Sequence, residues 1–144
     1  MKKLIYIIIL FYPLILSAIE KTKEEKVAKF VLENIQKDYT SCYAFYKIAE
    51  ESFRKSNAKK SVIRGLVKSA DTTLKFVHDL GEVLELKPQL MNEKNRIEIK
   101  KLSKIAKKDF NKLAQLYGLT CKQLIENQKQ RIDYWENLGN KKIK

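Results

Sequence analysis

The chain has 144 residues, with 30 lysines and arginines against 17 acidic side chains, which gives a formal net charge of +13. Its length suits a single compact domain. With 1 histidine, 4 glycines and 2 cysteines, it lacks the residues for a histidine-rich metal centre, a glycine-rich phosphate loop or a C-x-x-C redox pair. We therefore expect neither a cofactor nor a metal ion.

Residues 1–18 have the layout of a secretory signal peptide. Two lysines precede an apolar run over residues 4–16, and two small residues follow before the first acidic side chain at Glu20. We expect cleavage after Ala18 and export to the periplasm or the medium. The alternative is a membrane anchor over residues 4–18, although this run is shorter than the ~20 residues that cross a bilayer comfortably.

The domain expected to remain, residues 19–144, keeps 28 basic and 17 acidic side chains and a net charge of +11. A basic exported protein can meet an anionic membrane surface or a cell-wall polyanion. Arginine is the residue best suited to bidentate phosphate binding, and it is scarce here: Arg54, Arg64, Arg96 and Arg131. The lysine content therefore also fits a general compositional bias. We expect the basic tail, residues 140–144, to fray.

A first helix is predicted to begin at Thr22, because Thr22 and Glu25 form a T-x-x-E capping box. Its apolar residues recur at helical spacing: Val27, Val31, Ile35, Cys42, Phe45, Ala49 and Phe53. Residues 37–41 are the weak point, because Asp38 interrupts this face and D-Y-T-S has low helix propensity. The helix is open to a bend or break there, and a turn is expected at Ser56.

A second helix is predicted over about residues 59–86, with Gly81 weakening its last turns by ~1 kcal/mol relative to alanine. A third is predicted over 89–117, with an irregular polar start as an alternative. Gly118 has the position of a left-handed C-terminal cap. Thr120 and Gln123 then form a second capping box, which begins a fourth helix ending at Gly139.

Four amphipathic helices joined by short turns predict an all-α fold. The expected architecture is an antiparallel bundle of about four helices after the N-terminal signal segment, with breaks in the first and third helices left open.

Three polar side chains beside the apolar stripes are candidates for function: Asp38, Asp71 and His78. A carboxylate in such a place can act as an acid or base, and it can equally cap a helix or pair with lysine. His78 is the one histidine available to a Cys–His pair, but a histidine at the edge of an apolar stripe more often belongs to the core boundary. The structural alternative is favoured for all three.

Three tyrosines surround the first cysteine: Tyr39, Tyr43 and Tyr46. Their spacing of three or four residues places them in a line beside the core face of a helix. They are candidate contact aromatics for a protein partner. Interleaved with lysines they superficially resemble a nucleic-acid stacking surface, but export argues against nucleic acid as a ligand.

Cys42 and Cys121 are expected to form a disulfide, because an exported chain reaches an oxidising compartment. There is a geometric difficulty. With a helix boundary near Gly118, Cys42 lies roughly 20 Å along the bundle axis from the level of Cys121, far beyond bonding reach. Two buried free thiols are the alternative.

The expected function is non-enzymatic: a small exported helical protein that acts through protein–protein contacts, as an accessory, chaperone-like or inhibitor protein. The sequence shows no recognisable combination of catalytic residues, which favours this interpretation without deciding it. Two alternatives stay open. One is a carboxylate-dependent enzyme acting on cell-wall glycan, and the other is a membrane-surface binder that uses its basic face.

Overall fold

The computed structural model describes residues 22–144, and the predicted signal segment, residues 1–18, lies outside the described residues. Within that range the chain forms five helices and no strand, which confirms the all-α fold. The helices are α1 (Lys23–Lys55), α2 (Lys60–Val83), α3 (Pro88–Lys108), α4 (Phe110–Glu126) and α5 (Gln128–Lys142). None of them combines the length and the apolarity that a membrane-spanning segment requires.

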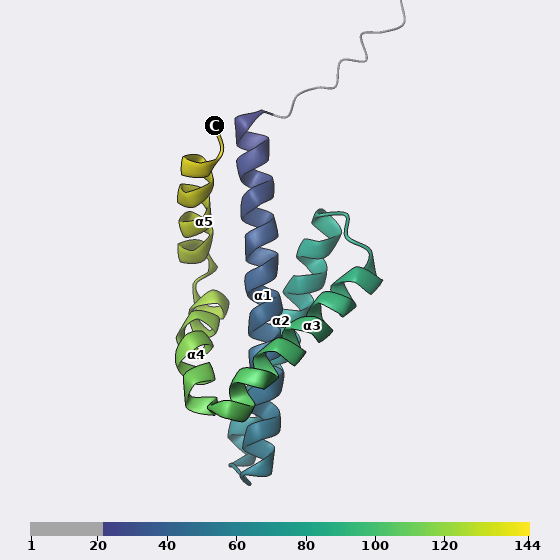
Figure 1. Ribbon diagram of the computed structural model, residues 1–144, viewed down its shortest axis with the longest axis vertical. Coiled ribbons are helices and arrows are strands. Elements are labelled where there is room, and N and C mark those ends of the chain that lie inside the picture. Colours follow the sequence, from purple (N-terminus) through teal and green to yellow (C-terminus); the bar gives the residue numbers. More distant parts are fainter. Residues whose placement is uncertain (1–21) are drawn as a thin grey trace, which may run out of the picture.

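Helix α1 is the centre of the bundle and contacts each of the other helices (Figure 1). α2 returns antiparallel to α1, α3 crosses back diagonally, and α4 and α5 run along the other side of α1. The 33 residues of α1 are continuous, so the break considered at residues 37–41 does not occur. Tertiary packing overrides low propensity here, because Tyr39 and Thr40 are buried and the Thr40 hydroxyl donates to the Gln36 carbonyl (3.0 Å).

The ends of α1 agree with the sequence signals. Glu25 N donates to the Thr22 hydroxyl (3.3 Å) and Thr22 N donates to the Glu25 carboxylate (3.1 Å), which is the predicted capping box. At the other end Asn57 adopts a φ of 54°, and Ala58 N donates to the Phe53 carbonyl (3.0 Å). Asparagine tolerates this left-handed conformation, so the turn closes with little strain.

The chain reverses between α3 and α4 at Asp109, and the predicted boundary at Gly118 is wrong. Asp109 is extended (φ −161°, ψ 101°) and its carboxylate accepts from Lys112 N (3.0 Å), which caps the start of α4. Gly118 has no positive φ and lies inside α4, as does Thr120. The third predicted helix is therefore interrupted, but at Asp109 rather than near its start.

The position of this reversal resolves the disulfide geometry. α4 begins beside the end of α1, where the rings of Phe110 and Phe53 lie 6.1 Å apart. Cys121 follows Phe110 by the same number of residues as Cys42 precedes Phe53. Antiparallel helices of equal rise therefore bring the two cysteines to one level, and they form a disulfide with a Cα–Cα distance of 5.3 Å.

Helices α4 and α5 follow one another along the same side of α1, and together we call them the limb. A break at Asn127 (φ −148°, ψ 73°) separates the two helices. Helix α5 packs closely on the N-terminal half of α1 through Gly139, where an added Cβ would lie 3.1 Å from Phe30 and 3.2 Å from Val27. The helix passes Gly139 and ends at Lys142, so the predicted end at Gly139 comes too early.

Gly81 has a packing role that its helix propensity does not reveal. An added Cβ at this position would lie 1.9 Å from the sulfur of Met91, which is 1% exposed. The glycine thus permits α3 to approach α2 closely. The connection is tight as well, since Glu85 adopts a φ of 56° and Leu86 N donates to the Gly81 carbonyl (2.8 Å).

Loss of the disulfide should lower stability. The two cysteines are 79 positions apart in the sequence, and closing a loop of this length contributes roughly 4–5 kcal/mol to stability in the chain-entropy model. We expect the double variant Cys42→Ser/Cys121→Ser to unfold at a lower urea concentration than the oxidised protein, and to match the reduced wild type. Equal midpoints for the oxidised and reduced proteins would show that the bond contributes nothing.

Two glycine substitutions should change stability in opposite directions. Gly118→Ala should raise the free energy of unfolding by up to ~1 kcal/mol, because the residue is inside a helix and the new Cβ would meet only Phe45, at 3.8 Å. Gly81→Ala should lower it, because Met91 must move. Urea unfolding measures both. Destabilisation by Gly118→Ala would instead support the helix end that the sequence suggested.

Candidate functional site

Asp38 is held by two residues of α5. Its Oδ2 accepts from Arg131 Nε (2.6 Å) and from Trp135 Nε1 (2.6 Å), and its Oδ1 accepts from Arg131 Nη2 (3.1 Å). Such a bidentate, charge-assisted contact is among the stronger polar interactions in proteins. The carboxylate thus joins α1 to α5.

Aromatic contacts complete this cluster. The Arg131 guanidinium lies 4.7 Å from the centre of the Tyr134 ring and 4.9 Å from that of Trp135. The hydrogen bond that Arg131 donates to Asp38 raises the pKa of Arg131 above its ordinary value, so the guanidinium stays charged. Trp135 also meets Phe30 of α1 edge to face, with ring centres 6.1 Å apart. These contacts indicate a structural role for the cluster, which holds α5 against α1.

Two of the three candidate contact tyrosines are core residues in this structure. Tyr39 is 1% exposed and stacks on Phe76 of α2, with ring centres 4.7 Å apart. Its hydroxyl donates to the Leu124 carbonyl (3.4 Å) and accepts from the Gln128 side chain. Burial raises the pKa of Tyr39 to about 12, so the hydroxyl stays protonated at neutral pH.

Tyr46 is 7% exposed, and burial likewise raises its pKa. Tyr43 is half-buried. The ring faces of Tyr39 and Tyr46 are therefore packed inside the bundle, and Tyr43 is the one of the three that reaches solvent to any extent.

The remaining predicted polar residues are not assembled with Asp38. Asp71 and His78 both belong to α2, where Asp71 is exposed and His78 is half-buried. Both cysteine sulfurs are bonded to each other. A Cys–His nucleophile thus has no free thiol, and the three polar candidates form no common site.

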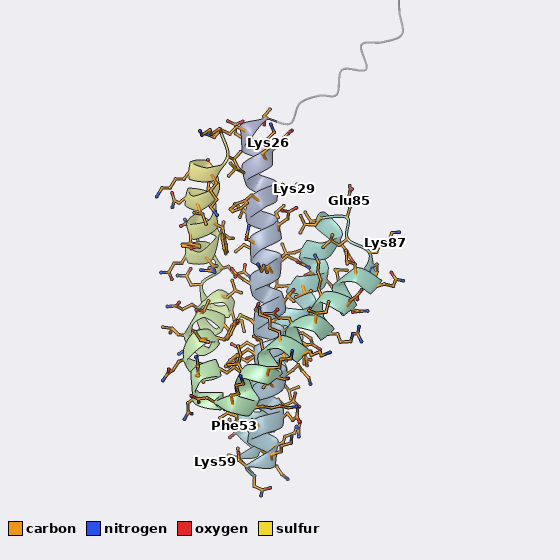
Figure 2. The ribbon with its side chains drawn as sticks, viewed as in Figure 1. Lys26, Lys29, Phe53, Lys59, Glu85 and Lys87 are labelled. Atoms are coloured by element: carbon orange, nitrogen blue, oxygen red, sulfur yellow. A yellow bond between two sulfur atoms is a disulfide. The ribbon has the colours of Figure 1, made fainter. Side chains whose placement is uncertain are left out.

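The candidate site is instead a groove of about 510 Å³ that sequence reasoning did not identify. It lies between α1, the end of α2 and α3. Figure 2 labels Lys29 on α1 and Glu85 and Lys87 at the connection of α2 to α3, which mark this region. We call it the α1–α3 groove. Its apolar wall consists of Leu84, Leu86 and Ile97, and Ile97 is 55% exposed.

The polar centre of the α1–α3 groove is Gln36. This side chain lines the groove, is 3% exposed, and has an Nε2 for which the described residues provide no acceptor. Asn95 Oδ1 on α3 is the other such buried atom in residues 22–144. A buried polar group without a partner costs ~1–3 kcal/mol. Each such group in a native structure calls for an explanation, and a ligand that supplies the missing bond is one.

Charged side chains line the rim of the α1–α3 groove. Glu33 pairs with Lys29 (3.7 Å), and Glu98 pairs with Lys101 (3.0 Å). Two further rim lysines, Lys37 and Lys94, are exposed and have no ion pair among the described residues. The rim therefore has positive charge available for an acidic group.

Two carboxylates in one cavity are also what a glycan hydrolase would need. Here each carboxylate already has a partner: Glu33 pairs with Lys29, and Glu98 pairs with Lys101 and accepts a hydrogen bond from the Ser41 hydroxyl (3.0 Å). This pairing favours binding over acid–base chemistry at the groove.

No family model matches the chain, and neither a curated protein nor a solved structure does. The function of the α1–α3 groove is therefore inferred from its own residues.

Replacement of Asp38 should destabilise the fold. Asp38→Ala removes the acceptor for Arg131 and Trp135, and we expect the free energy of unfolding to fall by about 1.5–3 kcal/mol. Asp79→Ala is the matched control, because its pair with Lys75 is exposed and within one helix, where such pairs contribute under ~0.5 kcal/mol. Equal urea midpoints for the two variants would refute the structural role of Asp38.

Proposed function

We propose that this is an exported binding protein that acts without catalysis, by holding a segment of a protein partner in the α1–α3 groove. The observation that carries the proposal is the buried Gln36 amide, which lacks an acceptor in a groove that combines an apolar wall with a charged rim. Recognition sites of this kind combine apolar contact area with a few placed polar groups. The disulfide fits an oxidising compartment such as the periplasm.

The residues of the groove define the chemistry of the partner segment. Leu84, Leu86 and Ile97 select an apolar side chain. Gln36 Nε2 requires an oxygen acceptor, which a backbone carbonyl or a side-chain amide supplies. The unpaired ammonium groups of Lys37 and Lys94 favour an acidic residue nearby. The expected partner segment therefore has an apolar anchor flanked by aspartate or glutamate.

Photo-crosslinking at Ile97 can identify the partner. A photoreactive amino acid at this position should crosslink to a segment of the stated composition, located by mass spectrometry. A synthetic peptide of that segment should bind the wild-type protein. Ile97→Glu should weaken binding at least tenfold, because it removes apolar contact and repels acidic residues. Leu119→Glu is the control, since Leu119 is 66% exposed on α4, outside the groove.

A second variant separates a binding role of Gln36 from a structural one. Gln36→Met removes the amide that lacks an acceptor but keeps the volume of the side chain. We expect it to raise the urea midpoint of the free protein and to weaken peptide binding. A peptide that binds all variants equally, or a crosslinked segment without an apolar anchor, would contradict the proposed function.

A further inference from the structure

A second concave surface lies at the other end of α2, between its N-terminal half and the C-terminal end of α1. Its volume is about 860 Å³, and Figure 2 labels Phe53 and Lys59 at this end of the molecule. Four cationic side chains line it: Arg54, Lys60, Arg64 and Lys68. We call this surface the basic groove.

The three cations on α2 repeat every four residues and therefore share one face of the helix. Lys60, Arg64 and Lys68 are all exposed and have no ion pair among the described residues. Like charges at this spacing destabilise a helix by ~0.2–0.5 kcal/mol per pair. The repulsion would be relieved by an anion that bridges them.

Acidic side chains neutralise only part of this charge. Glu50 accepts hydrogen bonds from Arg54 (2.9 Å) and Lys47 (2.8 Å). The hydrogen bond that Lys47 donates to Glu50, with a smaller contribution from the charge of Asp71, raises the pKa of Lys47. Asp71 is the single carboxylate that lines the groove. The cations of α2 therefore keep an excess of positive charge.

The basic groove also has an apolar floor. Ile63 and Val67 line it and are half-buried. Arg54 and Arg64 line the same groove. Arg54 already pairs with Glu50, whereas Arg64 has no ion pair among the described residues, and a planar guanidinium binds phosphate oxygens in pairs. A bare phosphate ion or a polyphosphate chain has no apolar portion for this floor. An anionic phospholipid has both parts, namely the phosphate of its head group and the hydrocarbon chains beneath it.

We propose that the basic groove binds the head groups of anionic phospholipids and brings this end of the bundle to a membrane surface. The basic groove does not overlap the α1–α3 groove in its lining residues, so this activity is independent of the proposed function. Binding is electrostatic at its core, and it weakens as salt screens the charges.

Vesicle sedimentation of the purified, disulfide-bonded protein tests the proposal. The protein should bind vesicles that contain phosphatidylglycerol, bind pure phosphatidylcholine at least tenfold more weakly, and lose affinity as salt rises. Arg64→Glu/Lys68→Glu should reduce binding at least tenfold. Lys100→Glu/Lys104→Glu is the control, because it makes the same charge change with the same spacing on exposed positions of α3. It should keep binding within about twofold.

Arg64→Gln/Lys68→Gln serves as a milder variant, and thermal unfolding confirms that each variant folds. Equal losses in the α2 and α3 variants would show a general charge effect and overturn the site. Binding to inorganic polyphosphate or polyglutamate without binding to the vesicles would overturn the assignment to lipid. Failure of vesicle binding leaves peptide binding at the α1–α3 groove untouched, so the two proposals fail separately.

Discussion

The register between α1 and the limb formed by α4 and α5 is the constraint on which the rest of the fold depends. It is fixed covalently by Cys42–Cys121 in the α4 half, and by the contact of Asp38 with Arg131 in the α5 half. The break at Asn127 separates these two attachments. Each half of the limb is thus located on α1 by its own link, and α1 is one continuous helix through both.

The other side of α1 has no covalent link, and the α1–α3 groove lies there. Three kinds of contact hold α3 in place: the close approach of Met91 to Gly81, the Ser41–Glu98 hydrogen bond, and packing of the buried Leu102. A helix held by packing and a few polar contacts separates from its neighbours at a lower free-energy cost than a helix held by a disulfide. The groove therefore lies on the side of the bundle that has no covalent cross-link.

The capping box at Thr22 and the cysteine pair could be predicted from the sequence because each depends on a short motif or on chemistry. The boundary at Asp109 could not, because Gly118 followed by T-x-x-Q is a competing end signal. Glycine inside a helix costs only ~1 kcal/mol, and the buried stripe of Leu113, Cys121 and Leu124 outweighs this. The α1–α3 groove could not be predicted from the sequence, because Gln36 lacks an acceptor only once α3 is in place. The contacts of Asp38 could not be predicted either, because its partners are remote in sequence.

The unbroken length of α1 sets a fixed distance between the two proposed binding surfaces. Gln36 in one groove and Arg54 in the other are 18 residues apart in the same continuous helix, which corresponds to about 27 Å at 1.5 Å per residue. Two ligands can therefore be bound together without competing. A partner that itself resides at a membrane would meet its groove at a high effective concentration once the other groove is occupied, so a rigid helix would convert two weak affinities into one strong attachment.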